Sequence, residues 1–290
     1  IVIIPAFGTS LEILNILKKK GINTHQFDTT CPFVSKVWNR SEMLAKQGYT
    51  IIIHGKAQHE ETRSTFSRCK KHGPSIIVEN LDDVHYLCEI IKSKDPIKFQ
   101  SRFKNKYSKS FNIQNDLKKI GVVNQTTMLA SETKQIIEIF KQAYSDVHGK
   151  ANEYVANTRD TLCYATNENQ DSTLNLLQQK VDLSIIVGGY NSSNTSHLVE
   201  LSSEKFQTFF INSATNISQD NIIKHFDLKT KQIISTNNFL PQKKCKIILT
   251  SGASCPDVIL EKVMQRIAQI KKQNLNQDKI IRNLEIKYSI

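Results

Sequence analysis

Short apolar runs alternate with amphipathic stretches along this chain. Runs rich in β-branched residues, such as residues 51–53 and 184–187, lead into polar loops and then into stretches with helical spacing of apolar residues. This order is typical of buried parallel strands in βαβ units, so it predicts an α/β fold. Ligands of parallel sheets bind beyond the carboxyl ends of the strands, which is where the polar loops of this chain fall.

The order of these segments repeats. Cys31 and Cys163 each follow a short apolar segment and precede a helical stretch, 132 positions apart (163 − 31). Each copy continues with a strand and a polar loop, another short strand, and a closing strand, polar turn and amphipathic helix. These segments lie at residues 51–62, 76–78 and 121–127 in the first copy and at residues 184–194, 209–212 and 247–254 in the second. A cysteine at the same place in both copies indicates that the two thiols serve chemistry.

A third closing segment opens the chain. Residues 1–4 predict a strand, residues 5–10 predict a turn, and a helix follows with an apolar stripe of Leu11, Leu14 and Leu17. The chain thus has three closing segments but only two cysteine-bearing segments that begin a copy. We therefore predict a third such beginning, with a third cysteine, upstream of residue 1. We therefore expect this chain to be a fragment of a longer protein.

Composition sets outer limits on the class of protein. A chain of 290 residues corresponds to roughly two domains of about 150 residues. No apolar run approaches the roughly 18 residues of a membrane span, and the apolar stretch at residues 1–4 is too short for a signal peptide. We expect a soluble protein.

The six cysteines form no CxxC pair and no dense cluster, which predicts a reducing compartment rather than a disulfide framework. Cys69, Cys88 and Cys245 are expected to be small buried apolar residues. Cys31 and Cys163 differ because each stands where a helix is expected to begin, and the N–H groups of a helix start stabilise a thiolate. Two or three such thiolates could bind an iron-sulfur cluster or zinc. The spacing alone does not decide between them, although zinc favours four ligands with local pairs.

Two polar loops are candidates for binding and for acid–base chemistry. Residues 191–196 (NSSNTS) combine hydroxyls, amides and a helix start, which are groups that hold phosphate oxygens, although such clusters are more often turns or helix caps. Ser254 and Thr126 have the same ambiguity. His59 and Glu61 can share one site, where a nearby diphosphate would raise the pKa of the carboxyl group and make it a better acid. The alternative for this pair is a solvated charged loop.

Seven segments, in order along nearly the whole chain, resemble the IspH/LytB family of 4-hydroxy-3-methylbut-2-enyl diphosphate reductases. They are residues 5–8 (PAFG), 28–38 (DTTCPFVSKVW), 54–62 (HGKAQHEET), 124–129 (NQTTML), 163–166 (CYAT), 191–194 (NSSN) and 251–254 (SGAS). The resemblance implies a trefoil of three αβα domains with small parallel sheets, in pseudo-threefold arrangement around a central 4Fe-4S cluster. The predicted domains are residues 1–23 as the remainder of the first, residues 24–150 as the second, and residues 151–290 as the third, whose C-terminal segment would return to the first.

The resemblance also implies roles for individual residues. Three cysteines would hold the cluster, two of them being Cys31 and Cys163, and the third lying upstream of this chain. The substrate diphosphate would be bound by polar side chains: His59, Ser192, Ser193, Asn194 and Ser254. Glu61 and Thr126 would manage the substrate hydroxyl and its proton.

The reaction that the resemblance implies is the reductive removal of an allylic hydroxyl, the last step of the non-mevalonate isoprenoid pathway. The hydroxyl would bind the open iron of the cluster, two electrons and protons would enter, and water would leave. The products would be isopentenyl diphosphate and dimethylallyl diphosphate. The alternative function is that of a basic α/β binding protein for phosphorylated ligands or RNA, with structural cysteines.

Phe7 departs from the bacterial pattern of the family, in which a histidine at this place contacts the diphosphate. Phenylalanine donates no hydrogen bond, so that contact would be lost. Residues 5–8, 37–38 and 124–129 resemble instead the plastid and cyanobacterial branch of the family. We therefore expect a plastid protein, of chloroplast or apicoplast type, whose transit peptide is not in this sequence.

The chain carries 39 Lys and Arg against 27 Asp and Glu, a net charge of +12. A basic face would suit an acidic partner, and the resemblance implies a ferredoxin-type electron donor. The alternative is a lysine-rich surface without a dedicated partner.

One basic stretch, residues 92–119, carries aromatic residues at every fourth position from 99 onward: Phe99, Phe103, Tyr107 and Phe111. Aromatic residues among lysines can bind single-stranded nucleic acid. This spacing more often marks the buried face of a helix, which is the prediction here. We expect neither a nucleic-acid nor a membrane partner.

Overall fold

The computed structural model describes residues 1–156, 161 and 163–273. The chain forms two compact units, Ile1–Asn167 and Glu168–Ile290, and each is described by itself. This division falls inside a helix, whereas the sequence predicted boundaries after residues 23 and 150. The three-domain arrangement stays a prediction. So does the return of the C-terminal segment, because residues 274–290 lie outside the described part of the chain.

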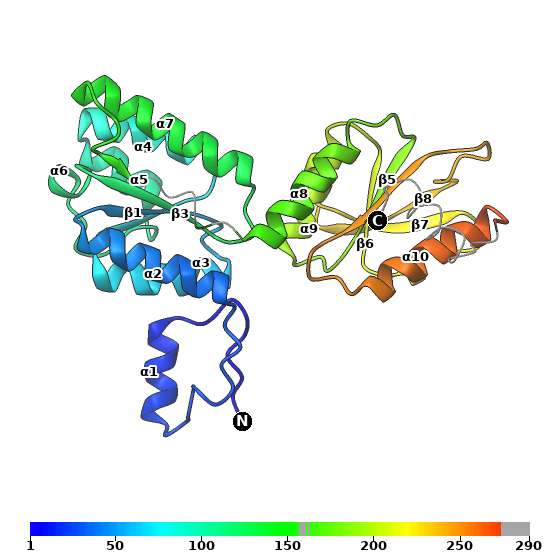
Figure 1. Cartoon of the computed structure of the whole chain (residues 1–290), viewed down its shortest axis with the longest axis horizontal. Helices are drawn as coiled ribbons and strands as arrows, with labels where there is room; N and C mark the ends of the chain where they lie inside the picture. The colour runs from blue at the N-terminus through cyan, green and yellow to red at the C-terminus, as the bar shows by residue number, and fades with distance from the viewer. Residues whose placement is uncertain (157–160, 162, 274–290) are drawn as a thin grey trace, which may run out of the picture. The chain divides into compact units, whose positions relative to one another are not determined.

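Unit 1 contains a four-stranded parallel sheet in the order β2-β1-β3-β4 (Figure 1). Its strands are β1 (Thr50–His54), β2 (Ser75–Val78), β3 (Ile120–Asn124) and β4 (Val155–Ala156). Its helices are α1 (Leu11–Lys19), α2 (Pro32–Lys46), α3 (Glu60–His72), α4 (Leu81–Ser93), α5 (Pro96–Phe103), α6 (Ile113–Asp116) and α7 (Ala130–His148), and α8 (Tyr164–Leu176) begins in this unit. The strands predicted at residues 51–53, 76–78 and 121–124 are confirmed.

Helices cover both faces of this sheet (Figure 1). Ile52 and Val122 belong to the core that includes residues of α4, α5 and α7, whereas Ile51 and Ile53 belong to the core that includes residues of α2 and α3. Successive side chains of a strand point to opposite faces, so a sheet buried on both sides needs apolar residues at nearly every position. This explains why the strands read as continuous apolar runs.

The strand predicted at residues 1–4 is wrong. Ile4 forms a single bridge, with Asp28, while Ile1 and Ile3 are exposed. Within the described residues no named strand pairs with this segment, and an apolar run without a neighbouring strand does not form a ladder. The helix predicted after the turn is confirmed as α1, but none of its residues is buried.

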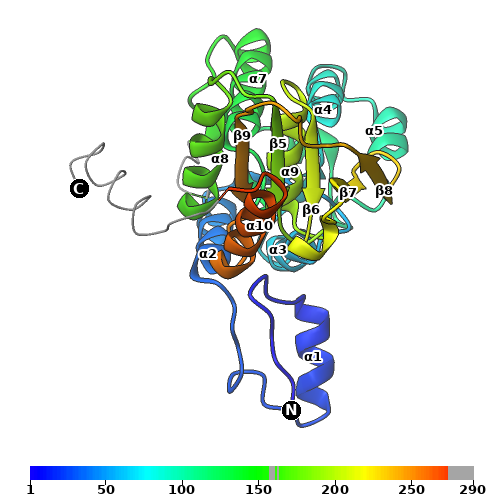
Figure 2. The ribbon, with the colours of Figure 1, turned by 90° about the vertical axis from the view of Figure 1, so that its right-hand side faces the viewer.

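Unit 2 contains a three-stranded parallel sheet in the order β6-β5-β9 and an antiparallel hairpin of β7 and β8 (Figure 2). The strands are β5 (Leu183–Val187), β6 (Thr208–Ile211), β7 (Ile222–Asp227), β8 (Gln232–Asn237) and β9 (Ile247–Ser251). Helix α9 (Ser193–Ser203) and helix α10 (Asp257–Ile270) pack on opposite faces of the parallel sheet, and a short 3-10 helix, η2 (Ala214–Asn216), follows β6. The strands predicted in the second copy are confirmed at β5, β6 and β9.

The hairpin of β7 and β8 was not predicted from the sequence. Most of β8 is exposed, including Ile233 and Ile234, so no alternation of apolar and polar residues marks this strand. The turn does carry a local signal. The Asp227 carboxylate accepts hydrogen bonds from the N–H groups of Lys229 and Thr230, and an aspartate that caps its own turn in this way is a recognised turn former.

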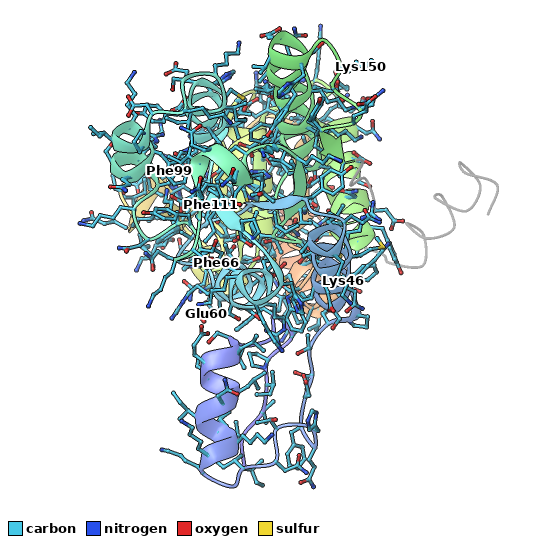
Figure 3. The ribbon with its side chains drawn as sticks, turned by 90° about the vertical axis from the view of Figure 1, so that its left-hand side faces the viewer. Lys46, Glu60, Phe66, Phe99, Phe111 and Lys150 are labelled. Atoms are coloured by element: carbon cyan, nitrogen blue, oxygen red, sulfur yellow. The ribbon has the colours of Figure 1, made fainter. Side chains whose placement is uncertain are left out.

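The aromatic residues of the basic stretch pack together, as predicted, but they do not share one helix. Helix α5 ends at Phe103, and the chain then runs along the edge of β2, where the N–H of Ile77 donates to the carbonyl of Lys106 at 2.7 Å. Phe111 nevertheless stacks on Phe99 with ring centroids 5.1 Å apart (Figure 3). Burial of the rings, rather than helical continuity, therefore maintains the spacing.

No helix in the described part of the chain is long and apolar enough to cross a membrane.

A glycine at the end of β5 lets α9 approach the sheet closely. A Cβ atom at Gly188 would lie 2.6 Å from the hydroxyl oxygen of Thr195, whose side chain is fully buried. We predict that Gly188→Ala lowers the free energy of unfolding by about 1–3 kcal/mol, because the extra methyl group overpacks this contact. Gly189→Ala is the matched control, since nothing lies within 4 Å of its Cβ position. Urea unfolding of both variants tests this, and equal stability would contradict it.

Candidate active site

His59 forms the amino-terminal cap of α3. It has extended backbone angles, and its Nδ1 atom accepts a hydrogen bond from the N–H of Glu61 at 3.2 Å. A nitrogen that accepts a hydrogen bond carries no proton, so the neutral ring keeps its proton on Nε2 and can donate from there. Burial lowers the pKa of His59, and the nearby positive charge of Lys56 lowers it further. The cap therefore presents a neutral imidazole with one N–H group.

Glu61 lies in the first turn of α3 and is 3% exposed. Thr126, which follows β3, donates to both carboxylate oxygens, from its N–H to Oε1 at 2.5 Å and from its hydroxyl to Oε2 at 3.0 Å. Burial raises the pKa of Glu61 to about 7, and the hydrogen bonds from Thr126 act in the opposite direction. Glu61 is thus a carboxyl group that can both give and take a proton near neutral pH.

Gln125 connects the loops that follow β1 and β3. Its Oε1 atom accepts hydrogen bonds from the hydroxyl of Thr62 at 3.0 Å and from the N–H of Lys56 at 3.2 Å. Its backbone N–H donates to the carbonyl of His54 at 2.8 Å. Gly55 permits this approach, because a Cβ atom there would lie 2.6 Å from the Thr62 hydroxyl. Sequence reasoning assigned no role to Gln125, although its place immediately before Thr126 is a signal that it could position that residue.

Cys31 and Cys163 stand where α2 and α8 begin. Cys31 caps α2, with Pro32 at its first position, and Cys163 immediately precedes α8, its carbonyl accepting from the N–H of Asn167 at 3.0 Å. The rings of Phe33 and Tyr164, the latter next to Cys163, meet edge to face with centroids 4.9 Å apart. The starts of these two helices therefore lie close together within unit 1.

The two cysteines differ from the buried ones. Both are free and partly exposed, whereas Cys69 and Cys88 are buried and desolvation raises the pKa of each to about 12. Burial is as predicted for Cys69 and Cys88. It is wrong for Cys245, which is partly exposed where the chain enters β9. Within the described residues, no three side chains of metal-ligating type gather around one point.

The polar loop of unit 2 starts α9. Ser192 caps this helix, its hydroxyl accepting from the N–H of Thr195 at 3.3 Å, and Ser193 and Asn194 are both buried. Neither amide atom of Asn194 has a hydrogen-bond partner among the described residues. A buried amide without partners costs stability, and a helix start attracts anions, so this loop is suited to an anionic ligand. Ser254 is exposed in the turn between β9 and α10.

The predicted residues fall into two sets. His59, Glu61 and Thr126 come together in unit 1, where Cys31 and Cys163 also lie. In unit 2, the loops that carry Ser192, Ser193, Asn194 and Ser254 follow β5 and β9, which are neighbours, so they share one edge of the sheet. Phe7 lies beside the first set, its ring edge to face with His59 at 6.4 Å between centroids.

These features are those of an α/β enzyme that combines partly exposed thiols at helix starts with a buried proton donor. Residues 1–268 match the model of the LytB protein family. The chain belongs to this family.

Individual relatives agree with this assignment. The chain is 42% identical over 276 residues to the 4-hydroxy-3-methylbut-2-enyl diphosphate reductase of Rippkaea orientalis, a match that covers 94% of this chain and 67% of the relative. It is also 42% identical to the enzyme of the same name from Crocosphaera subtropica, over 93% of this chain and 67% of the relative. A solved structure of the E-1-hydroxy-2-methyl-but-2-enyl-4-diphosphate reductase from Plasmodium falciparum is similar with a TM-score of 0.62 and 28% identity, covering 91% of this chain and 65% of that one.

The chain thus spans about two thirds of the length of these relatives. The family, the α/β fold class with small parallel sheets, and the assignment to a family of reductases are confirmed.

The raised pKa of Glu61 predicts a pH dependence of stability. The ordinary value is 4.5 and the folded value is about 7, so the folded protein binds this proton more tightly than the unfolded chain. The resulting stabilisation is complete below pH 4.5 and is lost as the pH rises through 7. We predict that the wild type loses up to about 3 kcal/mol relative to Glu61→Gln over this range.

Denaturant unfolding of both proteins at pH 4, 6 and 8 measures this difference. Glu60→Gln is the control, because Glu60 is exposed and pairs with Arg63 at 2.6 Å, and it should follow the wild type. Parallel pH profiles of the wild type and Glu61→Gln would contradict the prediction.

Proposed function

We propose that this protein reduces (E)-4-hydroxy-3-methylbut-2-enyl diphosphate to isopentenyl diphosphate and dimethylallyl diphosphate, the last step of the non-mevalonate isoprenoid pathway. Two electrons and two protons enter, the allylic C–O bond is replaced by a C–H bond, and the oxygen leaves as water. The observation that carries the proposal is the buried Glu61 held by Thr126, in a unit where the helices after Cys31 and Cys163 begin close together. Membership of the LytB family supports it.

Cys31 and Cys163 are proposed as two of three thiolate ligands of a 4Fe-4S cluster, the third lying outside these 290 residues. Their chemistry suits this group, since both thiols are free and partly exposed, and thiols are the usual ligands of such clusters. When bound, the cluster would supply the electrons of the reaction.

Glu61 is proposed as the group that delivers protons, with Thr126 holding it in place. Because its pKa is about 7, a substantial fraction of Glu61 is protonated at neutral pH and can protonate the departing hydroxyl. The fixed hydrogen bonds from Thr126 keep the carboxyl group in one orientation, so the proton is presented at a defined place.

Each unit carries groups that are proposed to bind the substrate diphosphate, and each unit is described by itself. In unit 2, the amide of Asn194 and the hydroxyls of Ser192, Ser193 and Ser254 would surround it, and the unpartnered amide of Asn194 is the strongest support. In unit 1, His59 would donate from Nε2. A neutral donor suits this place, because Nδ1 is already occupied by the N–H of Glu61.

A ferredoxin-type electron donor and a plastid location are proposed as well. The net charge of +12 would favour an acidic donor protein. The relatives from Rippkaea orientalis and Crocosphaera subtropica are cyanobacterial, which is compatible with a plastid origin. The alternative function, a binding protein with structural cysteines, is less favoured because the two conspicuous cysteines are partly exposed rather than buried.

We predict that Cys31→Ser in the full-length protein abolishes the brown colour and the acid-labile sulfide that anaerobic iron-sulfur reconstitution gives the wild type. A serine hydroxyl is a poor ligand for iron in such clusters, and two thiolates hold a cluster weakly. Cys245→Ser is the matched control, since this thiol is also partly exposed but precedes strand β9 rather than a helix. A colourless wild type after reconstitution would overturn the proposed function.

We predict that Glu61→Gln retains the cluster and substrate affinity but lowers turnover by a factor of about 100 or more, because the amide cannot deliver a proton. Single-turnover and steady-state assays of the full-length protein measure this. Glu60→Gln serves again as the control and should retain turnover, since Glu60 precedes Glu61 in the chain and its side chain is exposed (Figure 3). Near-normal turnover of Glu61→Gln would remove Glu61 from proton delivery.

A further inference from the structure

Arg68, in the third turn of α3, joins this helix to two other parts of unit 1. Its guanidinium group lies 3.5 Å from the centre of the Trp38 ring, on α2. It also donates to the carbonyl of Thr9 at 2.7 Å and to the Ser64 hydroxyl at 3.1 Å. Burial lowers the pKa of Arg68, while the carboxylate of Asp28 acts in the opposite direction.

Three side chains of α3 fasten the loop of residues 5–10 to the helix. The Ser64 hydroxyl donates to the Thr9 carbonyl at 3.1 Å, the Ser67 hydroxyl accepts from the N–H of Leu11 at 3.0 Å, and Arg68 completes the set. Positions 61, 64 and 68 are three and seven residues apart, so they follow one face of the helix. Glu61 therefore stands at the head of the same face that holds the loop.

The loop in turn contacts two residues of the proposed site. The carbonyl of Ala6 accepts from the N–H of Cys31 at 2.8 Å, and the ring of Phe7 packs edge to face on His59. Gly8 has a φ of +71°, and a Cβ atom there would lie 2.5 Å from the Trp38 ring, so the loop rests directly on the indole that Arg68 covers. A shift of this loop would disturb Phe7 and Ala6 together.

We propose that Arg68 is a positioning residue for the substrate site: by holding the loop of residues 5–10 against α3 and Trp38, it fixes Phe7 on His59 and the Ala6 carbonyl on Cys31. The kinetic part of this inference rests on the proposed function. Arg68 contacts neither Glu61 nor Thr126 through any described hydrogen bond, so its effect should fall on diphosphate binding through His59 rather than on proton delivery.

The guanidinium group is suited to this place because it combines a planar face with several N–H donors. The face stacks on the indole while the edge reaches the Thr9 and Ser64 oxygens. Lysine supplies a positive charge and can reach one carbonyl, but it lacks the planar fork. Arg68→Lys should therefore restore part of what Arg68→Gln loses.

The test uses the full-length protein after anaerobic reconstitution, as wild type, Arg68→Gln and Arg68→Lys. Arg102→Gln is the matched control: this guanidinium also lies over an aromatic ring, 5.7 Å from the centre of Tyr86, and it pairs with Asp83 at 2.8 Å, in contacts that involve none of the site residues. We expect Arg68→Gln to raise KM for the diphosphate substrate roughly tenfold while kcat changes by less than about twofold. The KM of Arg68→Lys should lie between those of the wild type and Arg68→Gln, and the KM of Arg102→Gln should match that of the wild type.

Amide hydrogen exchange of the cluster-free protein supplies a readout that does not depend on activity. The Cys31 N–H, which donates to Ala6, should exchange faster in Arg68→Gln than in the wild type, while the amides of β1 should be unchanged. If the reconstituted wild type shows no turnover, the proposed function fails, and this exchange measurement alone then decides the role of Arg68. A lower melting temperature with unchanged KM and unchanged exchange at Cys31 would overturn the inference, and Arg68→Lys decides it if Arg68→Gln does not fold.

Discussion

The site in unit 1 depends on the removal of one carboxyl group from water. A buried charged carboxylate is costly unless its oxygens are satisfied, and Thr126 satisfies both oxygens of Glu61. This contact requires the loops after β1 and β3 to meet, which the adjacency of the two strands and the absence of a side chain at Gly55 permit. The adjacency of β1 and β3 and the glycine at position 55 thus both serve the contact that keeps the Glu61 carboxyl group buried.

In both units, residues proposed for the site occupy helix starts. Cys31 caps α2, His59 caps α3 and Ser192 caps α9, so three of the residues assigned to the site occupy the same kind of position. The N–H groups in the first turn of a helix point toward such a position and favour a negative charge there. The fold thus provides several places that are already suited to anions before any special residue is added.

Most strands of the two parallel sheets could be predicted from the sequence. The physical reason for this success also explains which features could not be predicted. The strands β1, β2, β3, β5, β6 and β9 were predicted because burial on two faces leaves a continuous apolar run, whereas β4, only two residues long, was not. The segment at residues 1–4 shows the same pattern but has no strand beside it among the described residues. A local apolar pattern does not reveal whether another strand is available for pairing. The contact between Glu61 and Thr126 joins positions 65 apart (126 − 61), so only the resemblance to a known family, and not spacing, suggested that they act together.

The unpartnered amide of Asn194 has a consequence for the energetics of unit 2. Its two polar atoms are cut off from water and have no partner among the described residues, so the free protein gives up stability at this point. An apolar residue of similar size would make the unliganded unit more stable and, under the proposed function, would weaken the binding of the diphosphate. If the diphosphate binds here as proposed, it would satisfy these atoms, and ligand binding would then also stabilise the folded unit.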